Sequence, residues 1–161
     1  MSADPKTEVL ATVRASQGRR ILGITSLGGL GLLLVWLALT TSPTFIWQLF
    51  LIILAAAVIT LADRMRRATT RVIELTETEL RDSTGVVLAQ VADIQSMDRG
   101  TFAFKPSNGF LLKTKTPGAR GWQPGMWWRL GRRIGIGGMT PGSQTKAMTE
   151  IIAALIARRP D

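Results

Sequence analysis

The sequence predicts a membrane α+β protein, in which a transmembrane helical hairpin precedes a small antiparallel β-sheet or partial barrel closed by a C-terminal amphipathic helix. Three observations predict this fold. A run without charge extends from Ile21 to Ala62, short alternating apolar and polar stretches follow from about Arg71, and an apolar stripe at helical spacing ends the chain. The charge-free run is about twice the ~20 apolar residues that one membrane-spanning helix requires.

The charge-free run is interrupted once, by the polar and proline-containing stretch at residues 40–44. We therefore expect two spans, at about 21–40 and 45–62, within a hairpin region at 21–63 that follows an N-terminal tail of residues 1–20. A soluble helical hairpin is excluded because a 161-residue chain could not cover so much apolar surface. A cleaved signal peptide is excluded because its apolar region is only about 7–15 residues long.

Basic residues flank both spans, whereas the short connection between them carries no positive charge. By the positive-inside rule this pattern places both termini in the cytoplasm. Trp36 and Trp47 lie near the loop-side ends of their helices, as an interfacial aromatic belt requires. The flanking basic residues are Lys6, Arg14, Arg19 and Arg20 before the first span, and Arg64, Arg66, Arg67 and Arg71 after the second.

Small residues in the two spans are candidates for close helix packing in lipid, where apolar side chains gain little by meeting each other. They could pack the hairpin against itself or dock it onto another membrane subunit, and the sequence leaves both open. No ionisable group lies inside either span, which argues against an ion or proton pathway. The small residues are Gly23, Gly28, Gly29, Gly31, Ala55, Ala56 and Ala57.

Residues 69–159 are expected to form a cytoplasmic domain of short antiparallel strands. Ile73 and Leu75 share one face of a first strand, and Leu80 begins the return. A hairpin turn is expected at residues 83–85 and a further strand at 91–97.

A second hairpin is predicted at Asn108-Gly109, a strong turn signal. It would join a strand holding Phe102 and Phe104 to a strand holding Phe110 and Leu112. After a Pro/Gly-rich loop, "GWQPGMWWRLGRRIGIG" predicts a further strand region. Its apolar residues Trp128, Leu130, Ile134 and Ile136 share one parity.

The final element is expected to be a helix at about 141–159, with Thr140 as its N-cap and Pro141 in its first position. Gly137 and Gly138 would let the chain leave the sheet before it. The helix is the one element available to cover the sheet. Its apolar stripe is Met148, Ile151, Ile152 and Leu155.

Two N-terminal spans, the segment "ELTETELRDSTGVVLAQVADIQSMDRG" and a closing helix resemble bacterial PH-like membrane proteins over roughly residues 70–159. The resemblance implies a strongly bent sheet capped by a helix, a location in the bacterial inner membrane and no catalytic machinery. Some family members of this kind are linked to membrane-complex assembly or envelope maintenance. The lipid-reading residues of eukaryotic PH domains have no counterpart here.

Composition and spacing point away from an enzyme. The chain has no cysteine, histidine or tyrosine, which excludes thiolate nucleophiles, Cys/His metal sites and histidine-based triads. No catalytic residue, cofactor or metal site is therefore expected. The acidic run Glu74, Glu77, Glu79 and Asp82 is interpreted as a solvated strand face. "GIGGMTPGS" is not a phosphate-binding loop, because Ser143 stands where the essential lysine belongs.

The net charge of +9 indicates an anionic partner. Aromatic and basic residues are interleaved before the last helix, where they could pack the fold or contact headgroups or a protein. Nucleic acid is not expected, because no recognisable module is present. We therefore expect a non-enzymatic protein that binds lipid headgroups or a membrane-protein partner; the alternative is an accessory or assembly subunit docking through its hairpin. The candidate contact residues are Trp122, Trp127, Trp128, Arg129, Arg132 and Arg133.

Overall fold

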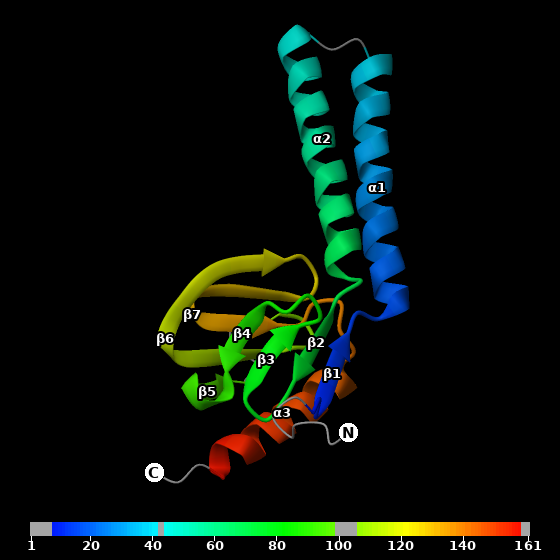
Figure 1. Cartoon of the computed structure of the whole chain (residues 1–161). Coiled ribbons are helices and arrows are strands. Elements are labelled where there is room, and N and C mark those ends of the chain that lie inside the picture. Colours follow the sequence, from blue (N-terminus) through cyan, green and yellow to red (C-terminus); the bar gives the residue numbers. More distant parts are fainter. Residues whose placement is uncertain (1–7, 42–43, 99–105, 159–161) are drawn as a thin grey trace. The chain divides into compact units, whose positions relative to one another are not determined.

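The computed structural model describes residues 8–41, 44–98 and 106–158, and it contains two compact units (Figure 1). One unit, Gln17–Arg67, is a pair of long helices. The other is built from chain on both sides of that pair and holds two antiparallel sheets and a C-terminal helix. The α+β composition expected from the sequence is confirmed.

Helices α1 (Gln17–Thr40) and α2 (Phe45–Ala68) are long and apolar enough to cross a membrane. Both extend past the charge-free run, α1 at its start and α2 at its end. In α2 the extension is stabilised by Asp63, which pairs with Arg66 and Arg67 one turn later, at 3.0 and 2.7 Å.

Small residues bring α1 and α2 together at part of their length. Gly31 is buried, and a Cβ added there would lie 2.5 Å from Cγ1 of Ile59. Ala55 on α2 is also buried. In contrast, Cβ atoms added at Gly28 and Gly29 would meet nothing within 4 Å. Only some of the predicted packing residues are thus used between the two helices.

A strand that sequence reasoning did not find, β1 (Ala11–Arg14), lies in the predicted N-terminal tail. It pairs antiparallel with β2 (Val72–Leu75), with Ala11 opposite Leu75 and Arg14 opposite Val72. The helical pair is therefore inserted into the connection between two paired strands. Ala15 and Ser16 join β1 to α1, and residues 69–71 join α2 to β2.

The first sheet has the order β1-β2-β3-β4, with β3 at Glu79–Asp82 and β4 at Val87–Gln90. Ile73, Leu75 and Leu80 are fully buried, which confirms the predicted alternation, and Leu75 pairs with Leu80. The turn predicted at residues 83–85 is also present, because Gly85 donates its N–H to the carbonyl of Asp82 at 2.9 Å.

The second sheet has the order β5-β6-β7, preceded by a short 3-10 helix, η2 (Val91–Asp93). The strand expected at 91–97 accordingly begins only at Ile94, in β5 (Ile94–Asp98). Strands β6 (Phe110–Gln123) and β7 (Trp127–Ile136) are long and curved (Figure 1). The prediction of a Pro/Gly-rich loop before Gly121 was wrong, because residues 116–120 continue β6, which pairs with β7 through two register shifts. Phe102 and Phe104 lie outside the described residues.

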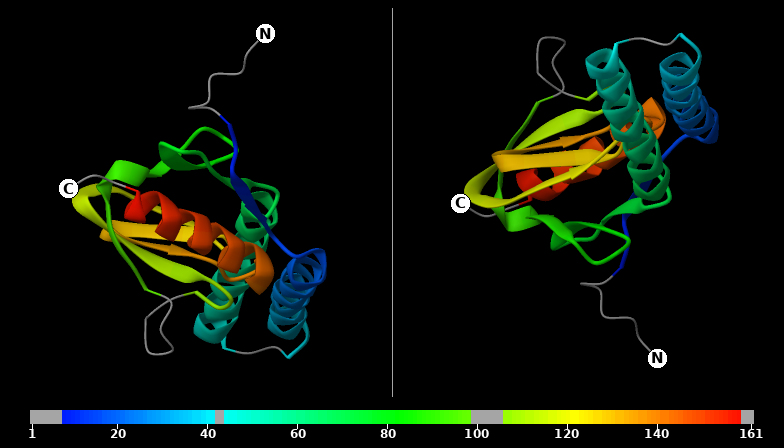
Figure 2. Two further views of the ribbon diagram at one scale, coloured as in Figure 1. Left: turned by 90° about the horizontal axis from the view of Figure 1, so that it is seen from below. Right: turned by 90° about the horizontal axis from the view of Figure 1, so that it is seen from above.

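Helix α3 (Gly142–Ala157) contacts β1, η2 and β5, and so covers elements of both sheets (Figure 2). Its Met148 and Ile152 are fully buried in a core that also contains Phe110 and Ile134. The predicted N-cap was wrong: Pro141 takes that position without a side-chain cap. Thr140 is buried instead, and its hydroxyl donates to the carbonyl of Asn108 at 3.4 Å.

Candidate interaction surface

The β6–β7 hairpin folds back on itself. The indole of Trp128 packs directly against Gly135: a Cβ added at Gly135 would lie 2.3 Å from the Cε2 and Nε1 atoms of the indole. These residues are seven positions apart in one strand, which would separate them by about 23 Å if β7 were straight. Gly131, with a φ of 60°, lies between them and provides the left-handed backbone that the bend requires.

Two of the predicted contact residues point into the structure. Trp127 is only 6% exposed, and its ring packs against Gly121. A Cβ added at Gly121 would lie 2.7 Å from the Cη2 atom of that ring. Its Nε1 atom has no hydrogen-bond partner among the described residues. Trp127 belongs to the core cluster, so its role is packing.

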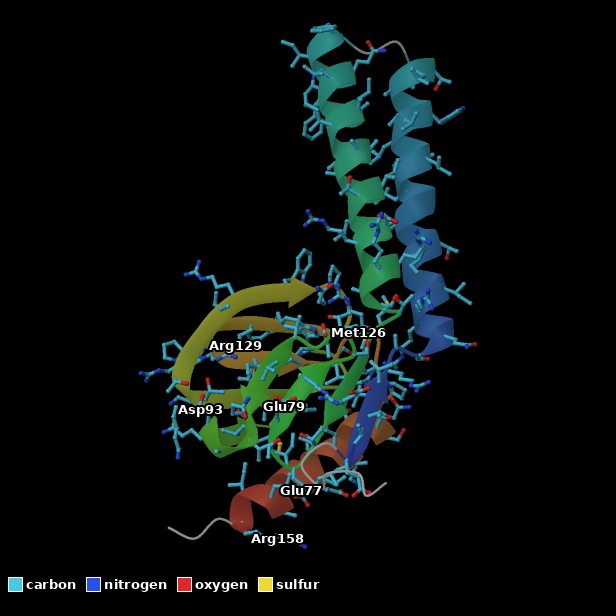
Figure 3. All side chains as sticks on the ribbon, viewed as in Figure 1. Glu77, Glu79, Asp93, Met126, Arg129 and Arg158 are labelled. Carbon is cyan, nitrogen blue, oxygen red and sulfur yellow. The ribbon has the colours of Figure 1, made fainter. Side chains whose placement is uncertain are left out.

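Arg129 links the two sheets. Its guanidinium lies against Gly118, its Nη1 atom donates to the carbonyl of Leu88 in β4, and its Nε atom donates to the carbonyl of Gly131 at 3.3 Å (Figure 3). Leu88 lies at the register shift between β3 and β4, between the pairs Leu80–Ala89 and Arg81–Val87. A half-buried arginine that satisfies two backbone carbonyls is a structural residue.

Trp122 and Trp128 lie opposite each other across β6 and β7. Trp122 is 56% exposed and Leu130 is 58% exposed, whereas Trp128 is half-buried against Gly135. Two shallow hollows flank this pair. One is formed with Arg120, Arg129 and Leu130, and the other with the turn that joins β6 to β7.

Exposed cations lie on the same two strands as the aromatic pair. Lys113 and Arg133 are direct cross-strand neighbours, an arrangement that repels in the absence of a counter-charge. Arg133 is two positions before Gly135, so it shares a strand face with the position that Trp128 covers. None of the exposed cations forms an ion pair with a carboxylate among the described residues. They are Lys113, Lys115, Arg120, Arg132 and Arg133.

We call these residues the hairpin surface: Trp122, Trp128 and Leu130 together with Lys113, Lys115, Arg120, Arg132 and Arg133. It can place aromatic and aliphatic groups in an interfacial layer while its cations meet anions. Sequence reasoning found the tryptophans, Arg132 and Arg133 but missed Lys113, Lys115, Arg120 and Leu130. The alternation of lysines with buried residues at 112–115 was the available signal.

Two of the acidic residues, Glu74 and Glu79, pair with arginine. Arg81 pairs with Glu74 at 3.2 Å and with Glu79 at 3.3 Å, and this cluster lies on the strands of the first sheet. Asp82 is fully buried and so does not belong to a solvated face as predicted. Within the described residues, no group of three or more acidic, histidine or cysteine side chains could hold a metal ion.

Asp82 instead organises the β3–β4 turn. One carboxylate oxygen accepts from the N–H and hydroxyl of Thr84 at 2.9 and 2.5 Å, and the other pairs with Arg71 at 3.0 Å. Burial alone would raise the pKa of Asp82, but the hydrogen bonds from Thr84 and Arg71 outweigh it and hold the pKa below its usual range.

No protein-family model, curated protein or solved structure matches this chain. The assignment of a role therefore depends on the residues themselves.

Proposed function

We propose that this chain is a non-enzymatic protein of the bacterial inner membrane whose cytoplasmic domain, of PH-like type, binds lipid headgroups or a protein partner through the hairpin surface. The observation that carries the proposal is the combination on one hairpin of exposed Trp122 and Leu130 with five cations that lack ion pairs among the described residues. This combination is suited to an anionic interface more than to bulk water.

Membrane embedding is supported by the apolar surface of α1 and α2. Large side chains such as Leu32, Phe45 and Ile46 are 68%, 76% and 77% exposed, which is costly in water and favourable in lipid. Trp36 and Trp47 are also exposed, near the ends of the helices that adjoin the short connection. Arginines gather at the opposite ends, which favours cytoplasmic termini.

The PH-like assignment is supported by the order of elements. A four-stranded and a three-stranded antiparallel sheet precede a C-terminal helix that packs into the core with Met148 and Ile152. In this arrangement the helical hairpin replaces the β1–β2 turn. The domain is therefore joined to the two helices by linkers of only a few residues. The surface potential of an anionic membrane would then act on the cations of the domain.

The test uses a chain in which residues 17–67 are replaced by a Gly/Ser turn, which keeps β1 next to β2. After its folding has been verified by circular dichroism, its sedimentation with phosphatidylglycerol vesicles is compared with that on phosphatidylcholine vesicles. We expect salt-sensitive binding to the anionic vesicles only. Each basic residue near such a surface contributes about 1 kcal/mol, so Arg132→Glu with Arg133→Glu should abolish most of it.

Arg158→Glu, at the exposed end of α3, is the matched control and should reduce binding much less. Equal binding by the Arg132/Arg133 variant, or no binding by the folded parent, would reject headgroup contact. A protein partner bound by the same surface would then be identified by cross-linking from position 122.

The alternative, an accessory or assembly subunit that docks through its hairpin, is favoured by one observation. Three of the small residues are exposed and do not take part in packing between α1 and α2: Gly29, Ala56 and Ala57. Purification of the full chain in mild detergent tests this alternative. Subunits retained in fixed stoichiometry would support it, and a chain purified alone would reject it.

A further inference from the structure

A hollow lies between α1 and α2 at their arginine-bearing ends. It is lined by Gln17, Arg20, Ile21, Ile24 and Thr25 of α1 and by Arg66 of α2, and its volume is about 290 Å³. All six residues belong to the helical unit. None of them was singled out as a site residue from the sequence.

The polar part of the hollow is cationic. Arg20 is half-buried and forms no ion pair with a carboxylate of the described residues. Arg66 contacts Asp63, but Asp63 also pairs with Arg67 through its other oxygen. Asp63 is the single acidic residue of this helical unit, whose arginines are Arg19, Arg20, Arg64, Arg66 and Arg67. An anion in the hollow would therefore meet a strong positive excess.

The remaining part of the hollow is apolar. Ile21 is 61% exposed, and Ile24 follows one turn further along α1. The hydroxyl of Thr25 donates to the carbonyls of Ile21 and Leu22 at 2.8 and 3.2 Å, so it adds no donor of its own. Beyond Ile21 the helix carries no charge. A ligand that fills the whole hollow thus has one anionic end and one apolar end.

We infer that this hollow binds one anionic phospholipid, with the headgroup phosphate between Arg20 and Arg66 and an acyl chain along Ile21 and Ile24. A guanidinium group can donate two parallel hydrogen bonds to the oxygens of one phosphate. Basic pockets between transmembrane helices are suited to anionic headgroups. Free phosphate would leave the isoleucines uncovered, and a second copy of this chain would bring the same positive charge. The inference rests on the proposed embedding of α1 and α2 in a membrane.

The experiment is native mass spectrometry of the full chain in mild detergent, with phosphatidylglycerol, phosphatidylcholine of the same acyl chains, or inorganic phosphate added. We expect retained phosphatidylglycerol, little phosphatidylcholine and no retained phosphate. Arg20→Gln should lower the apparent affinity about fivefold, which corresponds to ~1 kcal/mol per basic residue, and Arg66→Gln added to it should lower it further.

Arg64→Gln removes a neighbouring arginine of α2 that contributes to the positive excess but does not line the hollow, and it should lower retention much less than Arg20→Gln does. Equal retention by the Arg20→Gln variant and the parent, or by phosphatidylcholine and phosphatidylglycerol, overturns the inference. Phosphate that displaces the lipid completely also overturns it, because the isoleucines would then contribute nothing. Because Arg66 has a partner in Asp63, the single Arg20→Gln variant decides the result if the double variant unfolds.

Extraction of membranes with alkaline carbonate separates this failure from failure of the proposed function. If carbonate releases the chain without detergent, α1 and α2 do not span the bilayer and both proposals fail. If the chain stays in the membrane and the Arg20→Gln variant retains lipid as the parent does, only the lipid site is rejected.

Discussion

The indole of Trp128 takes the place of a side chain at Gly135, with ring atoms 2.3 Å from where a Cβ would be. This contact holds the folded-back half of the β6–β7 hairpin against its first half. It also means that Trp128 serves the architecture of the hairpin surface while lining both of its hollows.

Gly135→Ala should therefore destabilise the domain by about 1–3 kcal/mol, the usual cost of overpacking a filled site. In a chain that already carries Trp128→Leu, the same substitution should cost much less, because the ring that it meets is gone. Urea denaturation of the four chains of this double-mutant cycle measures the difference. Additive costs would show that Trp128 and Gly135 are independent.

The arginines of the predicted contact cluster should divide into two groups. Arg129→Met leaves the Leu88 carbonyl without its charged donor and should lower the free energy of unfolding by about 1.5–3 kcal/mol. Arg132→Met should change it by less than about 0.5 kcal/mol, because its side chain is exposed. Thermal unfolding of both variants is the measurement, and equal losses would contradict the division.

Acid should weaken the first sheet through Asp82. Its folded pKa lies below the unfolded value of about 3.9, so its contribution to stability is complete above that pH and is lost as pH falls through the folded pKa. Denaturation curves between pH 6 and pH 2 should therefore show a decline below about pH 4 that Asp82→Asn reduces. The exposed Glu77→Gln serves as control, and an unchanged decline in the Asp82 variant would refute the assignment.

The β1 strand should be required for an independent domain. A fragment of residues 69–161 lacks Val13, which is fully buried opposite Ile73, and we expect it to aggregate or to unfold without cooperativity. The chain with residues 17–67 replaced by a Gly/Ser turn should unfold in one cooperative transition. Calorimetry of both distinguishes them, and a cooperative transition in the fragment would show β1 to be dispensable.

Membrane topology can be mapped with single cysteines, because the chain has none of its own. Thr41→Cys and Ser107→Cys place a thiol at exposed positions, one near the helix connection and one in the sheet-containing unit. We expect a membrane-impermeant maleimide to label position 41 in spheroplasts, and position 107 only after permeabilisation. Labelling of both in intact spheroplasts would argue against the spans, and the reverse pattern would invert the orientation.

Local patterns predicted the parts of the fold that local interactions determine. The alternation of apolar residues predicts Leu75 and Leu80 on successive strands, and helical spacing alone predicts the α3 stripe. β1 could not be found in this way. It is a four-residue strand whose partner, Val72–Leu75, lies beyond two long helices, so its neighbouring residues carry no signal of that pairing.

The hairpin surface shows a second limit. Gly118 falls in the segment whose glycine and proline predict a loop, yet it lies within β6 and makes room for Arg129, as Gly121 does for Trp127. A glycine in a strand indicates that something approaches closely. It does not indicate which side chain does so, because that depends on how far the strand bends.

The position of the helical hairpin between β1 and β2 determines the order in which the protein can assemble. During synthesis β1 leaves the ribosome first, and its partner follows only after both helices have been made. Until then the buried face of Val13 has no sheet to join. Completion of the domain therefore follows synthesis of both helices, and until then β1 is an unpaired strand of the kind that promotes aggregation.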